Sequence, residues 1–106
     1  MRLIPLNELP AQNIQVVLDG QYCGLTLRQK GPRIYLDLSA DERPVCAGAV
    51  CVSGANVLQS PSPHFSGTLH FYDLGGQAAP RWPELGSRYL LLYLSADEEI
   101  PDVLRF

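Results

Sequence analysis

The chain has 106 residues, of which 46% are hydrophobic and 18% are charged, and its net charge is -3. This length suits a single domain with one modest core. Its one lysine and scattered arginines form no basic patch for nucleic acid, and no apolar run approaches the ~20 residues that span a bilayer. We therefore expect no nucleic-acid partner and no membrane.

Residues 13–39 predict an antiparallel meander of three strands. Apolar side chains recur at every second position, which is typical of strands with one buried face. Asp19-Gly20 separates the first two strands and Gly31-Pro32 separates the next two, and both dipeptides favour tight hairpin turns.

Residues 44–52, with the sequence "PVCAGAVCV", are apolar on both faces and rich in small side chains. This pattern favours a strand that is covered on both sides, so we expect a central or interface strand. Cys46 and Cys51 are five residues apart in this strand, which predicts that they point to opposite faces and do not form a disulfide.

The second half of the chain predicts two further strands, at residues 67–73 and 88–95, separated by proline-containing loops. About six strands and no long helix predict an all-β fold. We prefer a small antiparallel barrel, OB-like in shape, because closure would protect the apolar final strand from forming an exposed edge. A β-sandwich is the alternative.

The domain organisation follows from these predicted strands. We expect an extended N-terminal arm at residues 1–12, a single barrel domain at 13–96 and a C-terminal tail at 97–106. Because the arm lies outside the predicted strands, deletion of residues 1–10 is expected to leave the barrel folded and to abolish assembly.

The pentapeptide "LSADE" occurs twice, at residues 38–42 and 94–98. Both copies have the Ser-x-x-Glu spacing of a capping box, which predicts that each strand ends at its serine and that the chain then turns out of the sheet. The alternative is a paired-carboxylate site for acid/base chemistry, but no nucleophile or base accompanies these acids. We therefore favour strand termination.

Other motifs give little support for catalysis. His64 and His70 lack zinc-ligand spacing, and Gly75-Gly76 lacks the lysine of a phosphate-binding loop. We expect no catalytic residue, no metal and no cofactor. Trp82 is different, because it follows Arg81 in a proline-rich loop, where a large ring on a stiff segment is typical of an interface anchor. A lid over the core is the alternative role for this ring.

Several segments, taken in order, resemble one protein family. They are the start "IPL", the meander "QVVLDGQYCGLTLRQKGPRIYLDLS", the strand ending "AVCVSGANVL" and the late "LGSRYLLLYLS". Together they resemble the cyanophage-type baseplate plug proteins of contractile-tailed phages. The resemblance implies a virion protein, assembled in the host cytoplasm, at the junction of tail tube, baseplate hub and spike. It also implies a homo-oligomer, either a trimer or a hexamer.

Residues 60–66 and 78–84 depart from the expected family pattern, so the resemblance says little about the contacts of these loops. A monomeric OB-like module that binds nucleic acid or sugar is the alternative function. For the phage role we expect protein-interface residues in the arm, in the second long loop and in the tail. These candidates are Leu3, Ile4, Leu6, Arg81, Trp82, Ile100, Val103, Leu104 and Phe106.

Overall fold

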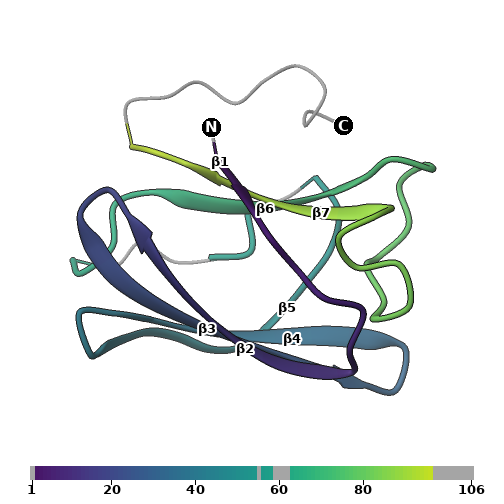
Figure 1. The fold of residues 1–106 in the computed structure, drawn as a ribbon, viewed down its shortest axis with the longest axis horizontal. Helices are drawn as coiled ribbons and strands as arrows, with labels where there is room; N and C mark the ends of the chain where they lie inside the picture. Colours follow the sequence, from purple (N-terminus) through teal and green to yellow (C-terminus); the bar gives the residue numbers. More distant parts are fainter. Residues whose placement is uncertain (1, 55, 59–62, 97–106) are drawn as a thin grey trace.

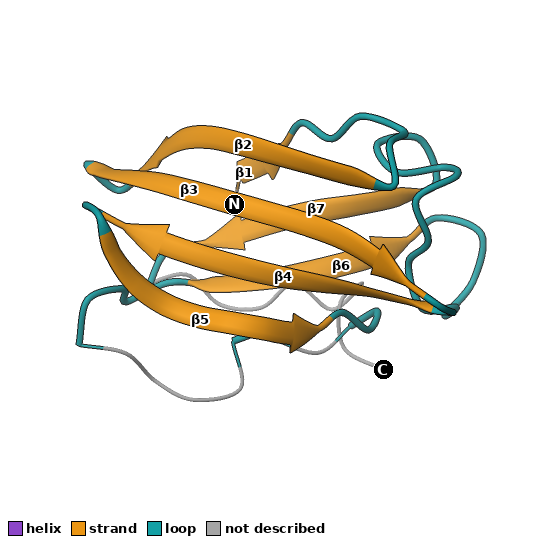
Figure 2. Ribbon diagram, turned by 90° about the horizontal axis from the view of Figure 1, so that it is seen from below, coloured by secondary structure: helices purple, strands orange, loops and turns teal. Residues whose placement is uncertain are grey.

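The computed structural model describes residues 2–54, 56–58 and 63–96, and within them seven strands form two antiparallel sheets. The three-stranded sheet has the order β1-β7-β6, and the four-stranded sheet has the order β2-β3-β4-β5. The two sheets lie one over the other (Figures 1 and 2). The strands are β1 (Arg2–Ile4), β2 (Ala11–Leu18), β3 (Gln21–Lys30), β4 (Arg33–Ala40), β5 (Arg43–Val50), β6 (Thr68–Asp73) and β7 (Tyr89–Leu94).

The prediction of an all-β fold is confirmed, and the two sheets match the sandwich alternative rather than a closed, OB-like barrel. The reason lies in β7. This apolar strand is central in its sheet, paired with β1 on one side and β6 on the other, so it needs no barrel closure to avoid an exposed edge. After β5 the chain crosses to the other sheet, where the amides of Gly54 and Val57 donate to carbonyls of β6.

The predicted meander is confirmed as β2, β3 and β4. Asp19 and Gly20 both have positive φ angles, of 48° and 77°, as a two-residue hairpin turn of type I′ requires. Apolar positions of the three strands face the other sheet and form one core with its inward side chains. Fully buried members include Leu18, Leu25, Leu27, Ile34, Leu36 and Leu38 from the meander and Ile4, Leu69, Phe71 and Leu91 from the other sheet.

Residues 44–52 were predicted to form a central or interface strand, and the central position is wrong, because β5 is the outer strand of the four-stranded sheet. The interface role stays a prediction. The register of β5 with β4 shifts, so that Leu38 faces Cys46 while Leu36 faces Ala49. This extra residue is a bulge, and Gly48 occupies it with a φ of 65°. The bulge shifts by one residue the alternation of side chains between the two faces of the strand. Both Cys46 and Cys51 therefore pack against the core instead of pointing to opposite faces.

The capping-box prediction for "LSADE" is wrong for the first copy. Strand β4 continues to Ala40, and Asp41 and Glu42 have φ angles of 50° and 66°, which makes them the two central residues of a hairpin turn. The chain stays in the sheet and returns as β5, with Ala40 opposite Arg43. In the second copy the strand ends at Leu94, next to the predicted serine, and the acids that follow lie outside the described residues.

The first residues do not lie apart from the domain. Arg2–Ile4 forms β1, in which Ile4 pairs with Leu91 and is only 1% exposed. A side chain in the core contributes to stability through its burial. Residues 2–4 therefore form a short strand of the three-stranded sheet, and the effects of deleting residues 1–10 on folding and on assembly stay predictions.

Candidate functional site

One end of the sandwich carries most of the irregular chain, and we call it the loop end. It consists of residues 5–10, the β3–β4 turn at residues 31–32, and the loop 74–88. These segments are far apart in the sequence but lie at the same end of the molecule, on the right of Figure 1. The predicted interface residues Arg81 and Trp82 belong to this end.

Hydrogen bonds join the three segments of the loop end. The Trp82 amide donates to the Gln29 side-chain oxygen at 3.1 Å, and the Gln29 amide donates to the carbonyl of Pro10 at 2.8 Å. The Ser87 hydroxyl donates to a carboxylate oxygen of Glu8 at 3.2 Å. The loop 74–88 is therefore tied to both neighbouring segments.

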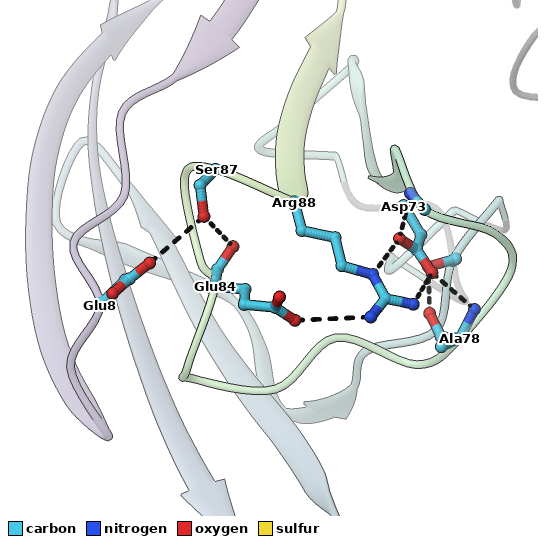
Figure 3. Close-up of polar contacts among 8 residues, drawn as sticks. Glu8, Asp73, Ala78, Glu84, Ser87 and Arg88 are labelled. Carbon is cyan, nitrogen blue, oxygen red and sulfur yellow. Dashed lines mark hydrogen bonds and ion pairs between the residues drawn. The ribbon is translucent and has the colours of Figure 1, made fainter.

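A buried ion pair holds the two ends of this loop (Figure 3). Arg88 donates from Nε to Oδ1 of Asp73 at 2.7 Å and from Nη2 to Oδ2 at 3.0 Å. The amides of Gly75 and Ala78 donate to the same carboxylate, at 2.8 and 2.9 Å. The Asp73 side chain is 0% exposed and that of Arg88 is 35% exposed, so the carboxylate that accepts these bonds is shielded from water while the guanidinium is half-buried.

The environment of Asp73 stabilises its ionised form. The hydrogen bonds from Arg88 are the main cause, with smaller effects from the two backbone amides, and together they outweigh burial and lower the pKa of Asp73 to about 2. The same contact raises the pKa of Arg88 above its ordinary value. Both groups are therefore charged across the neutral range, and the geometry is that of a structural anchor rather than of a group that exchanges protons.

Glu84 forms the hydrogen bonds that hold the second part of the loop, residues 84–88. Its carbonyl oxygen accepts from the amides of Ser87, Arg88 and Tyr89, and its carboxylate lies 3.4 Å from Nη1 of Arg88 (Figure 3). The φ of Glu84 is 107°, a conformation that residues with a side chain rarely adopt. The dense bonding around this one residue maintains the strained turn.

Gly86 brings the loop against the N-terminal segment. Its φ is 86°, and a Cβ atom placed on it would lie 2.5 Å from the carbonyl oxygen of Leu6. Only glycine satisfies both the backbone angle and this close approach. The position of the loop relative to Leu6 is thereby fixed.

A shallow cleft of about 590 Å³ opens in the loop end. Its lining includes Arg33 from β4, Arg81 and Glu84 from the loop, and Arg88. A smaller hollow adjoins it and contains Trp82, whose side chain is 37% exposed. The loop therefore presents an arginine and a partly exposed tryptophan beside a concave surface, a combination enriched in protein interfaces.

The other predicted interface residues differ in how exposed they are. Leu3 is 53% exposed on β1, whereas Ile4 is in the core and cannot be contacted from outside. Leu6, in the loop end, is half-buried and packs against the core. The remaining candidates, Ile100, Val103, Leu104 and Phe106, lie outside the described residues.

Sequence reasoning missed the Asp73–Arg88 pair and the two supporting residues Glu84 and Gly86. A signal for part of this arrangement was present, because Asp73 ends a strand and precedes Gly75-Gly76, and aspartate commonly accepts hydrogen bonds from amides shortly after it in a turn. Nothing in the sequence indicates that Arg88 is the partner.

The described residues contain little that resembles a catalytic centre. Over residues 2–54, 56–58 and 63–96, no group of three or more His, Cys, Asp and Glu side chains is arranged to hold a metal ion. His70 is buried and lies 3.0 Å from the hydroxyl of Thr68, and burial raises the pKa of the Cys51 thiol to about 12. The same part of the chain contains no helix long and apolar enough to cross a membrane.

Comparison with known proteins identifies the family of the chain. Residues 1–97 match a family model described as "Cyanophage baseplate Pam3 plug gp18". A search of the curated proteins found no match. The family match includes every strand and the complete loop end. The chain therefore belongs to the cyanophage baseplate plug family.

Proposed function

We propose that this protein is a non-enzymatic structural subunit of a contractile phage tail baseplate, a plug at the junction of tail tube, hub and spike. The observation that carries the proposal is the match of residues 1–97 to the baseplate plug family. Membership of this family implies a structural role in the baseplate, contact with other baseplate proteins and a place in the virion tail. The position at the junction, and a trimer or hexamer assembled in the host cytoplasm, are the finer parts of the proposal.

The geometry of the loop end supports a role in assembly. Association costs free energy whenever a mobile loop must be ordered, and a loop that is already ordered avoids most of that cost. Here the Asp73–Arg88 pair and the hydrogen bond from the Trp82 amide to Gln29 fix the conformation of the loop in the unbound protein. Trp82 and Arg81 therefore form a preorganised contact surface, and we assign the main contact with a neighbouring tail protein to them.

The test combines the purified protein with the tube and hub proteins of the same phage. Light scattering after size-exclusion chromatography gives the mass of the protein alone and of each mixture. We expect a discrete trimer or hexamer, or co-elution with one of the tail proteins. A strict monomer that co-elutes with none of them would contradict the proposal.

Two variants locate the contact. The double variant Arg81→Ala, Trp82→Ala is expected to lose co-elution while its circular dichroism spectrum stays that of the wild type. Tyr22→Ser is the matched control, because Tyr22 is an exposed aromatic residue, at 58%, beside the β2–β3 turn at the opposite end of the sandwich. Loss of co-elution in the control and retention in the double variant would place the contact elsewhere.

A further inference from the structure

Two arginines of the cleft, Arg33 and Arg81, form no ion pair within the part of the chain that the structure describes. Both residues are exposed. Arg88 lines the cleft as well, but Asp73 and Glu84 already occupy its guanidinium. The available positive charge of the cleft therefore comes from Arg33 and Arg81.

A third cation, Lys30, is near Arg33 in the sheet but does not line the cleft. Lys30 pairs with Arg33 across the β3–β4 turn, and its ammonium group lies 5.9 Å from the centre of the Tyr35 ring. The chain as a whole has a net charge of -3, so a cleft lined by Arg33 and Arg81, with Glu84 already next to Arg88, is locally positive on an acidic protein. Such a local field favours an anionic partner at this surface.

The rest of the lining consists of Glu84, whose carboxylate lies 3.4 Å from Nη1 of Arg88, and of apolar groups. Pro32, Ala78, Ala79 and Pro83 contribute aliphatic groups, and Tyr89 contributes an aromatic one. The neighbouring hollow shares Pro32, Arg81 and Pro83 with the cleft and adds Trp82. A surface of this kind suits an occupant that has both a charged end and methylene or ring groups, as an acidic peptide segment does.

We propose that this cleft binds an extended, carboxylate-bearing segment of a partner protein. Arg33 and Arg81 bind a carboxylate through charge-assisted hydrogen bonds, and Trp82 packs against an adjacent proline or aliphatic side chain. The inference rests on the proposed function, since it names the chemistry of the partner that a baseplate subunit would contact through the loop end. A nucleic acid is disfavoured because its binding requires neutralisation of many phosphates, and two arginines on an acidic protein provide too few.

The test is a titration of the isotopically labelled full chain with the capped peptide Ac-Pro-Glu-Glu-Leu-Pro-NH2, followed by nuclear magnetic resonance. We expect shifts of the backbone amides at residues 31–34 and 78–84, with binding that weakens as salt is added. The peptide Ac-Pro-Gln-Gln-Leu-Pro-NH2 has the same shape without the charge, and it is expected to bind at least ~tenfold more weakly.

Variants make the result specific to the two arginines. The double variant Arg33→Gln, Arg81→Gln is expected to lower the affinity for the glutamate peptide ~tenfold or more. Arg43→Gln is the matched control, because Arg43 follows the β4–β5 turn at the opposite end, and it is expected to leave the affinity unchanged. The inference would be overturned if both peptides bound equally well or if the double variant bound the glutamate peptide as tightly as the wild type. It would also be overturned if no peptide bound at about 10 mM, or if a thymidine hexanucleotide bound more tightly than the glutamate peptide.

A separate measurement distinguishes failure of this inference from failure of the proposed function. Quantitative mass spectrometry of purified tails reports whether the chain is a tail component. Presence in tails without peptide binding would overturn the carboxylate site and leave the baseplate role intact. Peptide binding by a chain that is absent from tails would support the site and contradict the role.

Discussion

Arg88 and Asp73 are joined by two parallel hydrogen bonds, from Nε to Oδ1 at 2.7 Å and from Nη2 to Oδ2 at 3.0 Å. Asp73 is the last residue of β6, and Arg88 immediately precedes β7. The pair therefore closes the base of the loop that carries Arg81 and Trp82. Its integrity determines both the stability of the sandwich and the shape of the proposed contact surface.

Replacement of Asp73 by asparagine is expected to destabilise the protein strongly. The change removes the charge that neutralises a half-buried arginine and weakens the bonds from two backbone amides. We expect the free energy of unfolding to fall by about 3 kcal/mol, measured by urea denaturation. The Arg28–Asp37 pair is the control, because its side chains are 42% and 36% exposed, and Arg28→Gln should cost no more than about 1 kcal/mol. Similar losses in the two variants would contradict this account.

Acid is expected to remove the same contribution. The folded state lowers the pKa of Asp73 from its ordinary value of 3.8 to about 2, so the stabilisation is fully present above pH 3.8 and is lost as the pH falls towards 2. The difference in unfolding free energy between wild type and Asp73→Asn should therefore shrink over this window. Denaturation at a series of pH values measures it, and a difference that stays constant from pH 6 to pH 2 would show that Asp73 is not the group responsible.

The turn in the first "LSADE" copy is expected to gain stability from a glycine. Glu42 has a φ of 66°, which costs free energy for a residue with a side chain. Glu42→Gly should raise the free energy of unfolding by about 0.5–1 kcal/mol, since relief of strain exceeds the extra freedom of glycine in the unfolded chain. Asp41→Gly is the comparison, because it also removes the bond that the Asp41 carboxylate accepts from the Tyr22 amide at 3.0 Å. A larger gain at Asp41 than at Glu42 would refute the explanation.

The first strand is expected to be necessary for the fold. Ile4 is 1% exposed and Leu3 is 53% exposed, so two adjacent aliphatic residues differ mainly in burial. Ile4→Ala should lower the unfolding free energy by about 3 kcal/mol, and Leu3→Ala by less than about 1 kcal/mol. Thermal unfolding of both variants tests this. Equal effects would instead favour the arm expected from the sequence, which is not needed for folding but is needed for assembly.

Local signals in the sequence predicted the local parts of the fold. The alternation of apolar residues and the Asp19-Gly20 turn specify the β2–β3 hairpin without help from distant residues, and the structure confirms it. The bulge in β5 was not predictable in this way. It depends on Gly48, whose amide donates to the Asp37 carboxylate on the neighbouring strand at 2.6 Å, and that contact forms only once the strands have paired.

In the candidate site, too, sequence signals reach only local features and not contacts between distant residues. The proline-rich surroundings of Trp82 suggested either an interface anchor or a lid over the core, and the structure leaves the residue 37% exposed. The Asp73–Arg88 pair depends on the closing of a long loop between two strands, and the grouping of Arg33 with Arg81 depends on how that loop meets the β3–β4 turn. Neither relationship has a signature in residue spacing.

An electron cryomicroscopy reconstruction of the intact tail tests the central claim most directly. The account predicts density for this chain at the junction of tail tube, hub and spike, with Trp82 and Arg81 buried against another tail protein. A baseplate that lacks this chain at the junction, or one in which the loop end faces solvent, would contradict it.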